Sequence, residues 1–227
     1  MSQLKLFSTP DEIEVGIDEV GRGCLSGPVY AAAVILPKKF EDDIYLQIKD
    51  SKKLSKKKRA MLAEYIKKNA LDYGIGIVKP AEIDDINILQ ASFKAMHNAL
   101  DNLTKVSPEH ILVDGNLFKP YYCKKSDEFL THECVIEGDN KYFSIAAASI
   151  LAKEARDQYM TDLHNKYEHL QKYGWDKNKG YATKQHRTAI LEFGITKYHR
   201  HTFGICKRML QTFKENQEKK EENYTIS

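Results

Sequence analysis

The sequence predicts an α/β layer fold in a single domain, and three observations support this prediction. Short apolar runs, typical of buried strands, alternate along the chain with segments in which apolar residues recur every three or four positions, as in helices. Strands that alternate with helices pack as layers around one core. The 227 residues are 42% hydrophobic, which suits one core of ordinary size, and neither an internal repeat nor a linker divides the chain.

Five segments have the length and apolar content of strands. Pro37 closes the second of them, and the last two are each followed by a carboxylate, Asp114 in one case and Asp139 in the other. We expect strands at residues 15–17, 29–36, 73–78, 111–115 and 134–136.

Five further segments have the apolar spacing of helices. Ser55 is a suitable N-cap for the first, and Pro80 opens the second. The third has small residues such as Ala148 and Ala152 on one stripe, which predicts close packing on the sheet. We expect helices at residues 56–68, 80–103, 143–170, 184–193 and 204–213, with core positions Ile83, Ile86, Leu89, Phe93, Met96 and Leu100 in the second.

These elements predict one catalytic domain over residues 1–213, in which residues 184–213 form a helical C-terminal part. Residues 214–227 mix acids and bases without apolar spacing, so we expect a disordered tail there. The N-terminus has no apolar core of a signal peptide, and the longest apolar run, 29–36, is too short to span a bilayer.

Bulk composition neither identifies nor excludes a nucleic-acid partner. The formal net charge is only +3, so any such partner must be bound by local basic clusters. The segments 50–59 and 172–187 are such clusters, although each can also be a solvated surface. The four cysteines have no Cys-x-x-Cys spacing, which favours free thiols of a cytoplasmic protein over a disulfide framework or a zinc site.

The first strand leads into a stretch whose residues are suited to catalysis or ligand binding. Asp18 and Glu19 stand side by side, and Gly21 and Gly23 follow on either side of Arg22. Regular pleating sends adjacent residues to opposite faces, so the two acids can meet one metal ion only if the strand bends or ends there. On its own, the pair can also be a solvated strand end.

Two later carboxylates can join this pair. Asp114 and Asp139 also follow strands, although Asp114-Gly115 can be a simple turn and Asp139 can cap a helix. Clustered carboxylates repel one another, and binding a hard divalent cation is a function that compensates for this cost. Mg²⁺ and Mn²⁺ prefer such oxygen ligands. The four acids therefore indicate a metal site that can hydrolyse a phosphodiester.

Two histidines and the tryptophan can have either a functional or a purely structural role. His199 and His201 flank Arg200, where we favour a surface or phosphate-facing role over metal binding. Trp175 can stack on a base, but a core position is favoured.

The ordered motifs closely resemble the type 2 ribonucleases H, in particular the bacterial ribonuclease HII family. The resemblance runs from about residue 15 to residue 213 and is specific because the motifs occur in the family's order. The matching motifs are Gly16-Ile17-Asp18-Glu19-Val20-Gly21-Arg22-Gly23, Gly27-Pro28-Val29, Asp50-Ser51-Lys52-Lys53-Leu54-Ser55, Leu112-Val113-Asp114-Gly115, Gly138-Asp139, Ile145 to Lys153, Arg156-Asp157, and Lys179-Gly180-Tyr181-Ala182-Thr183 with His186.

This resemblance implies a ribonuclease H-like fold, with a mixed central sheet flanked by helices and a helical C-terminal part. It implies an endonuclease that depends on Mn²⁺ or Mg²⁺ and cleaves the RNA strand of RNA–DNA hybrids. It also implies cleavage 5′ of single ribonucleotides embedded in duplex DNA, which leaves 3′-hydroxyl and 5′-phosphate ends. The implied roles are ribonucleotide removal and RNA primer removal in the cytoplasm, by a monomer that needs no membrane.

The resemblance also assigns roles to single residues. Asp18, Glu19, Asp114 and Asp139 match the family's metal-binding and catalytic acids. The turn Gly21-Arg22-Gly23 matches the segment that reads the ribose 2′-hydroxyl, and Tyr181 matches a tyrosine that stacks on the next deoxyribose; the alternative for Tyr181 is a core position. The other matched substrate contacts are Lys52, Lys53, Ser149 and Lys179.

Two alternatives to this function remain open from the sequence. A binding module that has lost catalysis would have little use for four acids, and a resolvase-like metal nuclease would not need the Gly-Arg-Gly and Lys-Gly-Tyr motifs. The sister type, ribonuclease HIII, has an extra N-terminal domain for which the residues before the first motif leave no room. The region of Cys123 and the C-terminal tail follow no pattern that we can assign.

Overall fold

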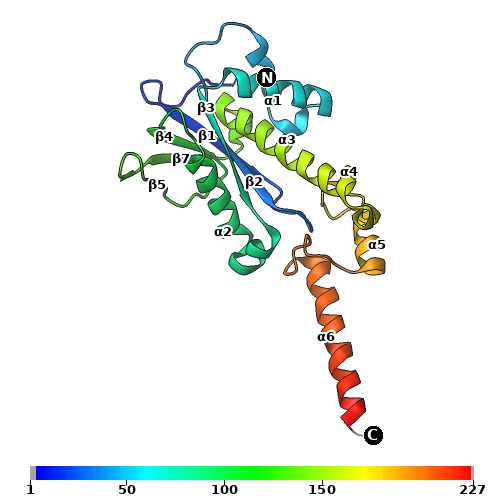
Figure 1. Ribbon diagram of the computed structural model, residues 1–227. Helices are drawn as coiled ribbons and strands as arrows, with labels where there is room; N and C mark the ends of the chain where they lie inside the picture. The colour runs from blue at the N-terminus through cyan, green and yellow to red at the C-terminus, as the bar shows by residue number, and fades with distance from the viewer. Residues whose placement is uncertain (1–3, 226–227) are drawn as a thin grey trace.

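The computed structural model describes residues 4–225 and contains a five-stranded mixed sheet between two layers of helices (Figure 1). The strand order is β3-β2-β1-β4-β7; β2 is antiparallel to both β1 and β3, whereas β1, β4 and β7 are parallel. The mixed sheet implied by the resemblance is thus confirmed. The strands are β1 (Glu14–Val20), β2 (Val29–Ile35), β3 (Asp72–Val78), β4 (His110–Asp114) and β7 (Thr131–Val135).

The helices cover the two faces of the sheet unequally. Helix α2 packs on one face, and α1 and α3 pack on the other. Helices α4, α5 and the start of α6 form a separate cluster at one end of α3. The helices are α1 (Lys56–Asn69), α2 (Pro80–Asp101), α3 (Phe143–Lys166), α4 (Trp175–Asn178), α5 (Lys184–Phe193) and α6 (Gly204–Thr225), with 3-10 turns at Ile44–Gln47, Ser51–Lys53, Gly138–Asn140 and Glu168–Tyr173. Within residues 4–225, no helix is long and apolar enough to cross a membrane.

Small residues allow the helices to approach the sheet closely. A Cβ atom on Gly16 of β1 would lie 2.3 Å from the carbonyl carbon of Ser144 in α3. On the opposite face, a Cβ on Gly76 of β3 would lie 1.9 Å from the Ala95 carbonyl oxygen of α2. Ala148 and the other alanines at the start of α3 are fully buried, as their stripe predicts.

Several elements differ from the sequence prediction, among them an unexpected short helix α4 and a last strand that begins at Thr131 and ends at Val135. Helix α2 is interrupted at Asn87, whose φ of 66° is not helical and whose side chain accepts hydrogen bonds from the amides of Leu89 and Gln90, which caps the second half. Helix α3 ends at Lys166, four residues early, and a 3-10 turn follows. A short hairpin of β5 (Tyr122–Cys123) and β6 (Glu128–Phe129), near Cys123, was not expected from its irregular sequence.

Helix α6 corrects the prediction of a disordered tail. It continues past Phe213 to Thr225 and extends away from the body of the molecule in Figure 1. The segment 214–225 is rich in Glu, Lys and Gln and contains neither Gly nor Pro, so its intrinsic helix propensity is high even without apolar spacing. Residues 226 and 227 of the expected tail lie outside the described residues.

A pair of neutral histidines lies in the C-terminal cluster. His186 Nδ1 is 2.9 Å from the Tyr181 carbonyl oxygen, so this nitrogen donates and His186 Nε2 accepts the Trp175 indole N–H at 3.1 Å. His199 Nδ1 accepts the Thr196 amide at 2.9 Å, which leaves its proton on Nε2 beside His186. Burial lowers the pKa of both histidines. Burial, together with repulsion by His186, lowers the pKa of His199 to about 3.

This pair predicts acid sensitivity of the fold. Between pH 6.5, the ordinary histidine pKa, and the folded pKa of about 3, the unfolded chain binds a proton at His199 that the folded chain does not. Stability should therefore fall with decreasing pH, by at most about 1.4 kcal/mol per pH unit from this group. His199→Asn, whose amide oxygen can still accept from Thr196, should reduce the slope of unfolding free energy between pH 7 and 5. An unchanged slope, relative to wild type and to the exposed control His201→Asn, would contradict this account.

Candidate active site

The carboxyl ends of the three parallel strands meet at one edge of the sheet. Ile17 of β1 pairs with Val113 of β4, so the next residues, Asp18 and Asp114, lie at neighbouring positions. Asp114 pairs in turn with Val135 of β7, after which the 3-10 turn Gly138–Asn140 carries Asp139. The topology therefore gathers the predicted acids from three segments that are far apart in the sequence.

Asp18 and Glu19 nevertheless lie on opposite faces of β1. The strand continues to Val20, so the pleat alternates through both residues. Asp18 is 7% exposed under α3 and interacts with Ser149, whereas Glu19 faces α2 and pairs with Arg22 at 3.2 Å. Consistent with this, among the side chains that the structure describes, no three of Asp, Glu, His or Cys converge as a ready-made set of metal ligands.

Asp114 and Asp139 are held by neighbouring groups. Asp114 accepts the Gly138 amide at 2.7 Å. Asp139 is 4% exposed and lies against Asp50, a residue of a matched motif for which the sequence predicted no role of its own. Burial, then Asp114 and Asp50, raise the pKa of Asp139 to about 6, although Lys52 opposes the shift.

The site contains more negative charge than its own cations balance. Burial raises the pKa of Asp18 far above its usual range, and repulsion by Glu19, Asp114 and Asp139 adds to the shift. Burial also raises the pKa of Glu19, which Arg22 only partly counteracts. These hard oxygen donors suit a divalent cation such as Mg²⁺ or Mn²⁺.

Two predicted lysine contacts border this edge. Burial alone would lower the pKa of Lys52, but Asp139, Asp50, Asp18 and Asp114 together raise it, so the ammonium group lies in the field of the acids. The Lys53 ammonium group is exposed, contacts the side-chain oxygen of Asn140 and lies 3.9 Å from Asp50. Ser149, another predicted contact, shares a 2.9 Å hydrogen bond with Ser51.

Two buried arginines hold the glycine turn beside the acids. Arg200 donates to the carbonyl oxygens of Gly21 and Arg22, both at 2.7 Å, and to that of Gly27 at 3.0 Å. Arg156 donates to the carbonyls of Ser26, Pro28 and Lys179. Gly21 has a φ of 96°, and a Cβ there would lie 2.2 Å from Arg156 Nε, so only glycine fits between the arginine and the turn.

The Lys-Gly-Tyr motif lies against the same turn. The Gly180 carbonyl accepts from the amide of Leu25 at 2.9 Å, and a Cβ on Gly180 would lie 2.4 Å from the Ser26 carbonyl oxygen. Tyr181 is 39% exposed, which excludes the alternative of a core tyrosine. The Lys179 ammonium group is less available than expected, since it contacts the Thr161 hydroxyl and the Asp176 carbonyl.

Sequence reasoning misjudged one side chain of this region and missed others. His199 is 1% exposed, so the expected surface or phosphate-facing role is wrong for it, whereas the favoured core position of Trp175 is confirmed. Arg156 belongs to a motif noted in the sequence, but nothing local indicates that it or Arg200 is buried. Their many carbonyl partners come from distant segments, which only the fold reveals.

The shape of the site is open rather than a deep pocket. A small cleft of about 50 Å³ between α2 and the strand ends includes Glu19, Arg22 and Asp114, with the buried Ser92 hydroxyl on the α2 side. A larger hollow of about 630 Å³ between α1 and α3 contains none of the four acids. An open surface suits a long polymer better than a small molecule, which proteins usually enclose.

Comparisons with known proteins agree with this geometry. The family model for ribonuclease HII matches residues 15–206. The chain is 55% identical to ribonuclease HII of Bacteroides thetaiotaomicron over 199 residues, which are 88% of this chain and 93% of the relative. It is 45% identical to that of Cytophaga hutchinsonii over 207 residues, 91% of this chain and 96% of the relative.

Solved structures share the architecture. The ribonuclease H2 of Pyrococcus horikoshii superposes with a TM-score of 0.73 at 24% identity, covering 88% of this chain and 98% of the other, which shows the common fold. The ribonuclease HII of Archaeoglobus fulgidus, solved as a complex with PCNA, gives a TM-score of 0.66 at 29% identity over 85% and 95% of the two chains. A Bst ribonuclease HIII solved with Mn²⁺ superposes with a TM-score of 0.64 at 20% identity, covering 88% of this chain and 69% of the other.

The excess negative charge predicts that a neutral substitution stabilises the metal-free protein. Asp18→Asn keeps the shape of the side chain but removes the carboxylate that Glu19, Asp114 and Asp139 repel. In buffer with a chelator at pH 8, the variant should melt at a higher temperature, by about 2–4 °C for each kcal/mol of relieved repulsion. Added Mn²⁺ should raise the melting temperature of the wild type more than that of the variant. A variant that melts below the wild type in chelator would contradict the electrostatic account.

Proposed function

The chain belongs to the ribonuclease HII family, and on that premise we propose that this endonuclease of RNA–DNA hybrids also cuts 5′ of single ribonucleotides embedded in duplex DNA, leaving 3′-hydroxyl and 5′-phosphate ends. One observation carries the proposal. The parallel strand ends bring Asp18, Glu19, Asp114 and Asp139 to one open edge, next to the turn Gly21–Gly23. That edge thus combines an acid cluster with a segment that can sense a single sugar.

Enzymes of this family depend on divalent metal ions, and we assign the metal-binding role here to the four acids. Mn²⁺ or Mg²⁺, when bound, would activate a water molecule and stabilise the leaving oxygen. The protein's own part is to hold the carboxylates in place: the Gly138 amide fixes Asp114, and Ser149 fixes Asp18. Because Asp18 and Glu19 lie on opposite faces, Glu19 must approach from the α2 side.

The glycine turn can recognise a 2′-hydroxyl through its backbone. In a planar trans peptide, the carbonyl of one residue and the amide of the next point in opposite directions. Since the carbonyls of Gly21 and Arg22 both point toward the buried Arg200, the amides of Arg22 and Gly23 point away from it. Backbone groups so presented can bind the hydroxyl that distinguishes RNA from DNA without reading a base.

Basic side chains complete the proposed substrate surface. Lys53 is exposed next to the acid edge and suits a phosphate contact, and Lys52 lies closer to the acids. Because the Lys179 ammonium group already has partners inside the protein, its contact with a phosphate would require it to leave them. Phosphate contacts of this kind position a duplex but carry no sequence information.

We further propose that the protein works as a cytoplasmic monomer in ribonucleotide removal and RNA primer removal. Its four cysteines are free thiols, as in proteins of reducing compartments. The complex of the Archaeoglobus relative with PCNA supports a place of action on replicating DNA.

A cleavage assay tests the proposed function. The substrates are a DNA duplex with one ribonucleotide, a long RNA–DNA hybrid and an all-DNA duplex, each with Mn²⁺, with Mg²⁺ and with a chelator. We expect the enzyme to cut 5′ of the single ribonucleotide only when metal is present, and to leave the all-DNA duplex intact. Binding of both ribonucleotide-containing substrates without cleavage would instead identify a non-catalytic hybrid-binding module.

Tyr181 should contribute most to kcat/KM on a duplex with a single embedded ribonucleotide. Its ring can lie flat on the deoxyribose at the RNA–DNA junction, which is the step from the ribonucleotide to the deoxyribonucleotide that follows it. A ribose at that position would be crowded. Tyr181→Ala should therefore lose on the order of 1–3 kcal/mol of transition-state stabilisation on that substrate, taking base stacking as the analogue. Tyr181→Phe should lose less because the ring remains. The measurement is kcat/KM on the single-ribonucleotide duplex and on the long hybrid; equal losses on both would remove Tyr181 from junction recognition.

A further inference from the structure

A chain of charged side chains connects helix α1 to the ring of Tyr181. Arg59 of α1 donates to Asp157 of α3 at 3.2 Å. The other carboxylate oxygen of Asp157 accepts from the Lys153 ammonium group at 2.7 Å. That ammonium group lies 5.5 Å from the centre of the Tyr181 ring. Asp157 therefore lies between the basic segment that contains Arg59 and the ring that we assign to junction recognition.

The Tyr181 ring is held against α3 by two cations. Lys153 and Arg156 are three residues apart on this helix, and the Arg156 guanidinium lies 5.7 Å from the same ring. Such distances allow attraction between a cation and the electron-rich face of the ring. The remaining exposed surface of the ring is then free to meet a sugar.

The two cations are anchored in different ways. Arg156 is fixed by the carbonyl oxygens of Ser26, Pro28 and Lys179. Lys153, whose long side chain is only 17% exposed, has its hydrogen bond with Asp157 as the anchor. Loss of that carboxylate would let the Lys153 ammonium group turn to solvent, since a free lysine side chain gains rotamer freedom.

We propose that Asp157 is a positioning residue for ribonucleotide-junction specificity: it holds Lys153 over Tyr181 and fixes the ring relative to helix α1. The proposal rests on the function proposed above, because it needs Tyr181 to contact substrate. Asp157 itself is 8% exposed and acts through Lys153. Its contact with Arg59 ties the same carboxylate to α1, whose first turn carries lysines that suit phosphate binding.

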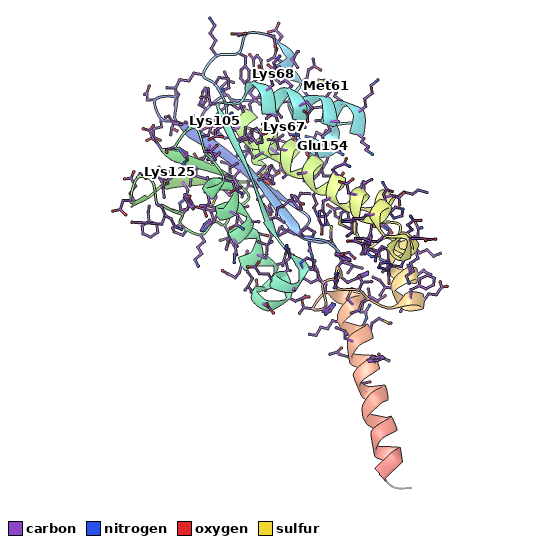
Figure 2. The ribbon with its side chains drawn as sticks, in the orientation of Figure 1. Met61, Lys67, Lys68, Lys105, Lys125 and Glu154 are labelled. Atoms are coloured by element: carbon purple, nitrogen blue, oxygen red, sulfur yellow. The ribbon has the colours of Figure 1, made fainter. Side chains whose placement is uncertain are left out.

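Helix α3 supplies a matched control. Glu154 accepts from Arg59 Nε at 2.5 Å, so it makes the other half of the ion-pair contact between α1 and α3. Figure 2 shows Glu154 on α3 beside α1. A change at Glu154 therefore weakens the contact between the helices without removing the anchor of Lys153.

The experiment compares Asp157→Ala with Glu154→Ala. For each, kcat/KM is measured on the single-ribonucleotide duplex and on the long hybrid, together with the melting temperature. The ratio of interest is kcat/KM on the single-ribonucleotide duplex divided by kcat/KM on the long hybrid. Asp157→Ala should lower this ratio by roughly threefold to tenfold, the effect of losing one cation–π contact. Glu154→Ala should change the ratio less than twofold, even where both variants melt at a lower temperature.

Two further variants show whether Asp157 acts through Lys153 and the ring. Lys153→Met keeps an apolar stem and removes the charge, so it should lower the ratio as Asp157→Ala does; it also carries the test if Asp157→Ala does not fold. Adding Asp157→Ala to Tyr181→Ala should change the ratio no further. The proposal is overturned if Asp157→Ala and Lys153→Met leave the ratio unchanged, or if Glu154→Ala lowers it equally. Failure of the wild type to cut the single-ribonucleotide duplex would instead overturn the proposed function.

Discussion

Mutual repulsion among buried carboxylates dominates the electrostatics of the open sheet edge. The parallel pairing of β1, β4 and β7 brings Asp18, Asp114 and Asp139 to one edge of the sheet, and burial strengthens their repulsion. The surrounding protein compensates only in part, through Lys52 and Arg22. A divalent cation would supply the missing positive charge, so the arrangement that costs stability without metal suits the metal-binding role that we propose.

The segments that we propose to recognise the substrate are held by a second set of buried charges. Arg156 and Arg200 have main-chain carbonyls as partners, and these carbonyls belong to the glycine turn, to residues 26–28 and to the Lys-Gly-Tyr motif. The glycine turn and the Lys-Gly-Tyr motif are about 160 residues apart in the sequence, yet Leu25, two residues after the turn, donates a hydrogen bond to Gly180 and so brings the two segments together. The acids and the groups that we propose to contact the sugar thus belong to one hydrogen-bonded framework, in which a shift of either set would move the other.

Much of this arrangement is encoded locally, and the remainder is not. An apolar run followed by an acid identifies Asp114 from the sequence because strand and strand end are both short-range features. The break at Asn87 and the burial of His199 escaped prediction, since the first depends on a side-chain cap and the second on packing against Trp175 and Tyr173. The contacts of Asp50 and Arg200 could not be predicted either, because their partners come from distant segments.

We propose that the four acids together hold the metal ions, although Asp18 and Glu19 leave β1 on opposite faces. Anomalous diffraction at the manganese edge, from crystals of the protein soaked in Mn²⁺, would locate these ions. Anomalous peaks are expected between the carboxylates of Asp18, Glu19, Asp114 and Asp139, with Glu19 reaching the metal from the α2 side. Peaks elsewhere on the molecule, or ordered metal that none of these four side chains contacts, would contradict this proposal.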